Sequence, residues 1–282
     1  MDKVESRGKR IAVHTVFLIA ITLVACLYIY PVFLMVDNSF KPFKEILTNV
    51  LALPSRLEWQ NYAYVIEKME YFRLFFNNVT ITVTGMMGIV LFSSMAAYIL
   101  DRRQTRITKG LHTFIITPML IPFQTIMITL LKFMNIIHLN GTTWGLGIQY
   151  WGFGIPMATF IYFNFMKSIP TEIDESAMID GATTFQTYGW IIFPLLKTVT
   201  ATVVVLDVMW IWNDFLLPLL MVNSSPASKT LVLAAYNFVG SLNTKWHYAL
   251  AAMVLAVLPS VIVFVFLQRY IVDGVVAGAI KG

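Results

Sequence analysis

Four carboxylates lie close together between two long apolar runs, in the segment from 169 to 194. They are Glu172, Asp174, Glu175 and Asp180, and the sequence contains no Lys or Arg between Lys167 and Lys197. Dense acids without basic neighbours are typical of a surface that receives a basic partner through charge complementarity. The chemistry indicated is therefore docking rather than catalysis.

The local sequence also predicts how this segment folds. Pro170 suits the first turn of a helix, and the acids just after it are stabilised by the positive end of the helix dipole. Thr171 with Asp174 resembles a capping pair. Gly181 can adopt a left-handed or closely packed backbone. We predict a short helix, a bend at Gly181 and a second short helix, which together form a helical hairpin across a membrane face.

The spacing within this hairpin resembles the EAA motif of the membrane subunits of bacterial ABC importers. That motif reads Glu-Ala-Ala, three residues, Gly, nine residues, Ile-x-Leu-Pro, and its positions are occupied here by Glu175, Ala177, Gly181, Ile191 and Pro194. A Ser at 176 and a Phe at 193 depart from the motif but keep size class or hydrophobicity. The resemblance implies a cytoplasmic coupling helix, seated in a cleft of an ATP-hydrolysing subunit. The alternative is an ordinary acidic cytoplasmic loop.

Ionisable side chains at membrane depth are costly and therefore mark candidate functional positions. By the helical rise, Asp207 lies about 18 Å into its span, near mid-bilayer, and Asp214 lies near the outer boundary. Together with Asp214, the residues Trp210, Trp212 and Asn213 offer the flat apolar surfaces and hydrogen-bonding groups that a sugar requires, and Asp207 is a further candidate for the substrate path. In the structural alternative, Trp212 belongs to the interfacial aromatic belt, and Asp207 caps or packs against a neighbouring helix.

Other chemistry finds little support in the residue types. Lys132 is expected to snorkel to the outer interface or to pair with Asp214. The histidines show no metal-ligand spacing, and the single Cys26 cannot form an intramolecular disulfide. The sequence has neither a GxxxxGK[ST] phosphate loop nor a nucleophile–base constellation. We therefore predict no catalytic residue, metal or cofactor in this chain, and expect ATP and Mg²⁺ to be bound by partner ATPase subunits.

The composition indicates a polytopic membrane protein. Of the 282 residues 58% are hydrophobic and 12% are charged, whereas soluble domains hold roughly 25% charged residues. The net charge of +5 is spread over short segments between apolar runs, which fits membrane orientation and argues against nucleic acid. Six runs approach the length of a span, at 11–36, 77–100, 111–137, 150–166, 195–222 and 248–271.

The basic residues orient these spans. The N-terminal segment and the 101–110 loop hold eight Lys and Arg residues, whereas the 138–149 loop holds none. By the positive-inside rule both termini, the 101–110 loop and the hairpin are cytoplasmic. We expect an all-α, multi-pass protein of the bacterial cytoplasmic membrane, in contact with lipid. The resemblance adds that residues 1–282 form one transmembrane domain with the type I ABC importer permease fold.

Two longer segments are predicted to face outward. Residues 37–76 form either a small folded cap or an amphipathic connector resting on the headgroups. Residues 223–247 are turn-rich and weakly charged, and are a candidate docking surface for an external partner.

Further stretches resemble the carbohydrate-uptake branch, specifically the second membrane subunit of maltose-type importers. They are WNDFLLPLL (212–220), FLQRY (266–270) and DGVVAGAIKG (273–282). The resemblance implies that the tail reaches back to the ATPase subunits, with Gly274, Gly278 and Gly282 allowing an extended backbone. The alternative is a frayed terminus.

Together these observations predict one of two homologous permease subunits, driven by two cytoplasmic ATPases and fed by an extracytoplasmic solute-binding protein. The expected cargo is a carbohydrate, favoured to be an oligosaccharide, moved by alternating access. A sugar phosphate or glycerol phosphodiester is the alternative cargo, although the deep charges are mostly acidic. An ion-coupled secondary transporter using Asp207 is the alternative from another class, but no inverted repeat is visible. A membrane-embedded enzyme lacks any candidate triad or metal cluster.

Overall fold

A computed structural model of the chain describes residues 2–239 and 244–279, and these residues form helices and loops with no strand. Contacts divide the chain into two compact units. The first comprises residues up to 69 together with 235–255, and the second comprises 70–234 together with the residues from 256 onward. The last helix, α14 (Trp246–Ala279), contributes its first part to the first unit and the remainder to the second.

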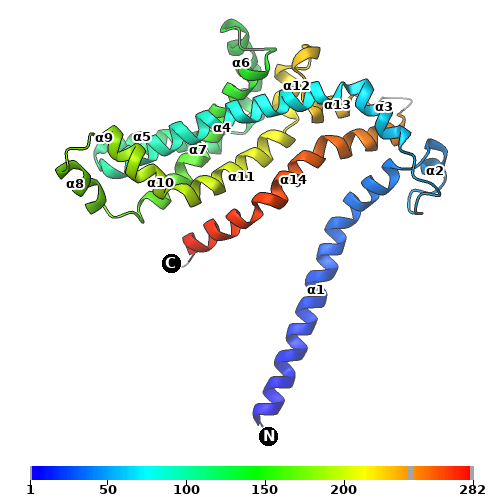
Figure 1. Cartoon of the computed structure of the whole chain (residues 1–282), viewed down its shortest axis with the longest axis horizontal. Helices are drawn as coiled ribbons and strands as arrows, with labels where there is room; N and C mark the ends of the chain where they lie inside the picture. Colours follow the sequence, from blue (N-terminus) through cyan, green and yellow to red (C-terminus); the bar gives the residue numbers. More distant parts are fainter. Residues whose placement is uncertain (1, 240–243, 280–282) are drawn as a thin grey trace. The chain divides into compact units, whose positions relative to one another are not determined.

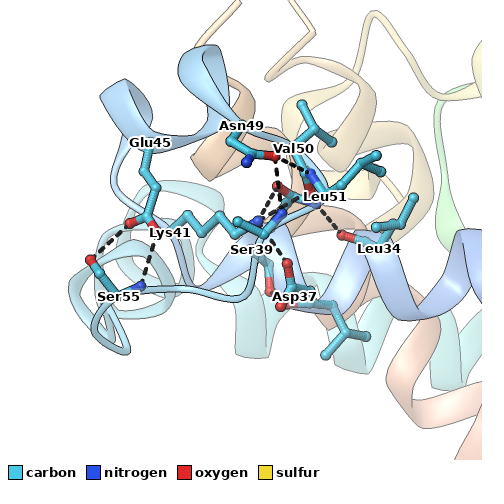
Figure 2. A network of polar contacts seen from close by, with 12 residues as sticks. Leu34, Asp37, Ser39, Lys41, Glu45, Asn49, Val50, Leu51 and Ser55 are labelled. Carbon is cyan, nitrogen blue, oxygen red and sulfur yellow. Dashed lines mark hydrogen bonds and ion pairs between the residues drawn. The ribbon is translucent and has the colours of Figure 1, made fainter.

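The first unit contains α1 (Asp2–Ser39), α2 (Phe43–Thr48) and α3 (Gln60–Met69). A buried ion pair holds the end of α1 to the segment that follows (Figure 2). Lys41 has a fully buried side chain, and its Nζ lies 2.8 Å from Asp37 Oδ2. The same ammonium donates to Asn38 Oδ1 at 3.0 Å and to the carbonyl of Val50 at 3.1 Å. Because all three partners are oxygens, the buried charge is well compensated.

Polar and aromatic contacts extend this network to α3. The amide of Asn61 donates to the carbonyls of Ser39 and Lys41. The hydroxyl of Tyr62 lies 2.6 Å from Ser39 Oγ, and its ring packs against Phe40 at 4.8 Å between centroids. Burial raises the pKa of Tyr62, against the opposing effect of the hydrogen bond with Ser39. The part of the predicted 37–76 segment from 37 to 69 is therefore folded on itself, which favours the cap, and residues 71–76 belong to the long helix that follows.

The second unit is built on three helices, α4 (Tyr71–Arg102), α7 (Thr143–Met166) and α11 (Lys197–Asn213) (Figure 1). The indole N–H of Trp151 on α7 donates to the carbonyl of Thr84 on α4 at 2.9 Å. A Cβ atom at Gly88 would come within 2.1 Å of the Trp151 ring. The close approach of α4 and α7 therefore depends on a residue without a side chain, as is common between membrane helices.

Shorter elements complete this unit. They are α5 (Arg106–Ile116), η1 (Thr117–Leu120), α6 (Phe123–Ile136), α8 (Glu172–Ile179), α9 (Thr184–Gln186), the π-helix η2 (Thr187–Ile192), α10 (Phe193–Leu195), α12 (Leu216–Met221) and η3 (Pro226–Ser228), with α13 (Leu231–Tyr236) at the boundary of the two units. Figure 1 shows α8 and α9 together at one end of the helices α4, α7 and α11.

By length and composition, three helices among the described residues could cross a membrane: Val13–Ser39, Tyr71–Arg102 and Trp246–Gln268. The number rises to five if each of two bent helix pairs is one span. The predicted span 150–166 falls on α7, whose 24 residues are long enough to cross but include many buried against the rest of the unit. The arrangement of six spans stays a prediction.

Two predicted spans are broken rather than continuous. Within 111–137 the chain turns by 103° between Leu120 and Phe123, because Ile121 is extended before Pro122, which cannot continue the helical hydrogen bonding. Within 195–222 the helix α11 begins after a bend of 74° and ends at Asn213.

The C-terminal prediction also needs correction. The backbone from 273 onward is helical through Ala279 as part of α14, not extended. The remaining residues 280–282, including the predicted Gly282, lie outside the described part of the chain. Glycines permit an extended backbone but do not impose one, and the helix continues because Val275, Val276, Ala277 and Ala279 between them are compatible with it.

Candidate functional site

The hairpin, residues 169–194, reverses direction at Gly181. The φ angle of Gly181 is +84°, a left-handed conformation that L-residues avoid. Its N–H donates to the carbonyl of Met178 at 3.0 Å, and the N–H of Ala182 donates to the carbonyl of Ala177 at 2.9 Å. These two bonds form a Schellman motif that ends α8. The predicted bend is therefore confirmed, together with its physical cause.

The returning arm starts with a capping box. The hydroxyl of Thr183 accepts the N–H of Gln186 at 3.3 Å, and Gln186 Oε1 accepts the N–H of Thr183 at 2.8 Å. This reciprocal pair starts α9 at Thr184, shortly after α8 ends at Ile179. The predicted order of short helix, bend and second helix is confirmed.

The returning arm is anchored to α4 through Tyr188. Its hydroxyl lies 2.6 Å from Ser94 Oγ on α4, and both residues are buried. Ile192 is fully buried, Ile191 is half-buried, and Pro194 is exposed in the first turn of α10. The arm is therefore held by Tyr188 and Ile192, which lie between the positions of the EAA-like spacing, rather than by Ile191 and Pro194 themselves.

The outgoing arm is anchored to the same helix through Asp174. Only 3% of this residue is exposed. Its Oδ1 accepts the hydroxyl of Tyr98 at 2.7 Å, and its Oδ2 lies 2.9 Å from Arg102 Nε. The capping pair with Thr171 is wrong, because Thr171 has helical backbone angles and makes no side-chain cap. Two strong donors on α4 draw the carboxylate away from the helix end, which leaves it unavailable to an external basic surface.

Arg102 joins three parts of this region. Besides Asp174, its guanidinium donates to Asp101 Oδ2 at 2.6 Å and to the carbonyl of Ile169 at 3.1 Å. A planar guanidinium can hold several acceptors at once, which an ammonium does less well. Sequence reasoning used Arg102 only to orient the membrane. The available signal was an arginine next to an acid at the end of a long apolar run, close to a loop rich in carboxylates.

The opposite face of the hairpin is exposed. It carries the acids Glu172, Glu175 and Asp180. Large apolar side chains lie beside them, with Ile179 86% exposed and Phe185 76% exposed. Ala177, in contrast, is buried on the inner side. Exposed apolar groups bordered by charges are typical of a protein–protein interface. The predicted coupling residues therefore divide into an outward docking set and an inward anchoring set.

The C-terminal end of α11 holds the other candidate residues. Asp214 follows the helix in an extended conformation, and its Oδ1 accepts the N–H of Leu216 at 3.1 Å. Its Oδ2 accepts the hydroxyl of Tyr150 at 2.9 Å. The ring of Tyr150 also meets the Trp210 ring edge-on, at 5.3 Å between centroids. Trp210 remains 40% exposed. Tyr150, which sequence reasoning missed, contacts both Trp210 and Asp214.

Two further side chains at this end bond to α14. Asn213 Oδ1 accepts the hydroxyl of Ser260 on α14 at 3.1 Å. Trp212 is 5% exposed, and its indole N–H donates to the carbonyl of Ala256 at 3.2 Å. Its assignment to an interfacial aromatic belt is therefore wrong, because the ring is inside the unit.

The three ionisable residues that the sequence analysis singled out, Asp207, Asp214 and Lys132, differ in environment. Asp207 is 9% exposed, and within residues 2–239 and 244–279 it makes no hydrogen bond or ion pair. Lys132 is exposed, and no ion pair with Asp214 occurs between these two described residues. Asp214 is instead satisfied by Tyr150 and by the backbone. An unpaired buried carboxylate in an apolar helix is expensive, which keeps Asp207 a candidate functional residue.

Comparison with known proteins finds a matching family and several similar permease proteins. Residues 88–276 match the model of the family described as "Binding-protein-dependent transport system inner membrane component". The "Probable starch degradation products transport system permease protein AmyC" of Thermoanaerobacterium thermosulfurigenes is 40% identical, over 90% of this chain and 92% of that protein. The "Multiple sugar-binding transport system permease protein MsmG" of Streptococcus mutans is 33% identical, over 93% and 95%.

A solved structure agrees in fold. The match covers 90% of this chain and 95% of a chain in a "bacterial ABC transporter involved in the import of the acidic polysaccharide alginate", with a TM-score of 0.79 and 20% identity.

Proposed function

Because this chain belongs to the family of binding-protein-dependent transport system inner membrane components, we propose that it moves a carbohydrate, favoured to be an oligosaccharide, through a pathway powered by ATP hydrolysis on other subunits. It is a multi-pass, all-α membrane protein with the fold of an ABC importer permease, as its EAA-like spacing led us to expect. Members of this family work with partner subunits and a binding protein.

The observation that carries the proposal is the exposed face of the hairpin. Its acids Glu172, Glu175 and Asp180 border the exposed side chains of Ile179 and Phe185. A partner with an apolar cleft and a basic rim would bury the apolar groups and pair the acids. The rigid bend at Gly181 fixes the shape presented to that partner. We infer that two ATPase subunits, one for each of two homologous permeases, supply this cleft and bind the ATP and Mg²⁺.

The proposed topology follows from the charges. The basic 101–110 loop and the hairpin lie on the cytoplasmic side with both termini, where ATP is available. Solute arrives from an extracytoplasmic binding protein on the other side. Displacement of the hairpin when the ATPases close then rocks the helices between inward-open and outward-open states.

The substrate class rests on the relatives. Proteins similar over most of their length are named for starch degradation products, for multiple sugars and for melibiose, raffinose and stachyose. The outer end of α11 adds chemical support, since Trp210 offers an apolar face and Asp214 a carboxylate beside it. Asp207 and Asn213 complete the proposed substrate path. A phosphorylated cargo would require basic residues there.

One experiment tests the docking role. The complex is purified through a tag on this subunit, and the ATPase subunits that accompany it are quantified. Glu175→Lys should reduce their recovery, because it places a positive charge against a basic rim. Recovery at the wild-type level, with normal substrate-stimulated hydrolysis, would contradict the proposal.

Uptake of labelled malto-oligosaccharide, raffinose and a glycerol phosphodiester by the wild-type complex tests the cargo, and preference for the phosphodiester would overturn the carbohydrate assignment.

A further inference from the structure

Three residues of α4 that contact the hairpin lie four positions apart. They are Ser94, Tyr98 and Arg102, and residues with this spacing form a stripe on one face of a helix. Ser94 is paired with Tyr188, Tyr98 donates to Asp174, and Arg102 binds both Asp174 and the carbonyl of Ile169. One helix face therefore holds both arms of the hairpin.

These contacts are shielded from water. Asp174 is 3% exposed, Tyr98 is 3% exposed and Ser94 is fully buried. The rings of Tyr98 and Tyr188 lie 5.5 Å apart between centroids, so the two anchors also touch each other. Charge-assisted bonds of this kind are short and directional. The stripe is therefore a stiff connection rather than a sliding contact.

The same helix extends to the outer end of the unit. Near the other end of α4, Asn78 donates to the carbonyl of Trp212 on α11 at 3.3 Å and accepts the N–H of Leu231 at 2.9 Å. Between these ends, Trp151 of α7 bonds the α4 backbone at Thr84. A displacement of α4 would thus reach α7 and the segment that holds Trp210 and Asp214.

We propose that Ser94, Tyr98 and Arg102 are positioning residues that make α4 the lever through which movement of the hairpin reaches the transport pathway. The inference rests on the proposed function, because it supposes that the hairpin is the part that ATPase subunits displace. It assigns the exposed acids to docking and buried Asp174 to transmission, two separable tasks within one short helix.

The test uses the complete transporter, with its ATPase and binding-protein partners, in proteoliposomes. Molecules of labelled malto-oligosaccharide imported per ATP hydrolysed are measured for Arg102→Gln and Asp174→Asn. We expect undiminished ATPase recovery and retained hydrolysis, but a fall of about fivefold in import per ATP. Arg102→Lys keeps the positive charge but loses the planar guanidinium with its several donors. Its import per ATP should therefore lie between the values of Arg102→Gln and the wild type. Arg103→Gln is the matched control, since no ion pair of Arg103 occurs in the described residues.

Variants with smaller changes separate the loss of these contacts from misfolding of the subunit. Tyr98→Phe removes one hydrogen bond to Asp174 but keeps the ring beside Tyr188, and combining it with Ser94→Ala removes a bond from each arm. The double variant should lower import per ATP more than either single variant while the yield of assembled complex stays constant. Ratios equal to those of the wild type and of Arg103→Gln would overturn the proposal.

The remaining outcomes separate this inference from the proposed function. Loss of the ATPase subunits from Arg102→Gln or Asp174→Asn would overturn the inference, because it would place the stripe in docking. Retention of the ATPase subunits by Glu175→Lys would instead contradict the docking role itself. Hydrogen exchange at amides 172–179 in the assembled complex gives an independent readout, and faster exchange is expected when the stripe is broken.

Discussion

The hydroxyl of Tyr150 donates to Asp214 Oδ2 at 2.9 Å while its ring meets Trp210 edge-on. Tyr150 is fully buried in α7, so a residue from another helix fixes the spacing between two candidate substrate-path side chains. The carboxylate of Asp214 has a second task, because it also accepts the N–H of Leu216 as α12 begins. The proposed substrate contact and the local fold thus share this carboxylate.

Trp210→Ala is expected to lower the maximal transport rate more than it changes the half-saturating concentration. The exposed part of the ring lines the proposed path, whereas we expect the binding protein to set the apparent affinity. Uptake across substrate concentrations in the assembled complex measures both quantities. A large rise in the half-saturating concentration at an unchanged maximal rate would make Trp210 a direct ligand-binding residue.

Asp207→Asn should impair uptake less than Asp207→Leu, because the amide keeps the shape and the hydrogen-bonding capacity. Both changes remove a buried carboxylate that has no partner in the described chain, so both should raise the thermal unfolding temperature of the purified subunit. Uptake and thermal unfolding are measured on the same preparations. Wild-type uptake by both variants would show that the carboxylate has no role in transport.

Gly181→Leu should destabilise the bend, since a side chain in the left-handed region costs roughly 1–2 kcal/mol. Gly181→Asn is the matched variant, because Asn tolerates this conformation better than other residues with a side chain. A Cβ at this position would meet nothing within 4 Å, so steric crowding inside the chain does not contribute. Recovery of ATPase subunits should follow the order wild type, Asn variant, Leu variant. Equal loss in both variants would point instead to a direct contact of Gly181 with the partner.

Lys41→Met should destabilise the folded cap by about 3–5 kcal/mol, because it leaves the buried carboxylate of Asp37 unpaired. Asp37→Asn combined with Lys41→Met removes both charges and should recover much of the loss. Limited proteolysis between residues 42 and 59 reports on the cap. Resistance equal to wild type in the Lys41→Met variant would show that the ion pair does not hold the cap together.

In the hairpin, local sequence predicted the bend but not which of the acids is buried. Gly181 has few alternatives to a bend once an acidic helix precedes it, and the EAA-like spacing by itself predicted the family and the fold. Asp174 could not be assigned in the same way. Four acids in one segment look alike in sequence, and only the proximity of Tyr98 and Arg102, more than seventy residues earlier, separates the buried one from the exposed ones.

The membrane spans show the same division between features that local sequence determines and features that distant contacts decide. Long apolar runs follow from the cost of exposing backbone to lipid, and that cost is local, so composition alone determined a multi-pass helical protein. The break at Pro122 is also local, because proline cannot continue a helix. The bond of Asp214 to Tyr150 and that of Trp212 to Ala256 depend instead on which partner each polar group finds. Those partners come from distant parts of the chain, and their selection was decided only by the tertiary structure.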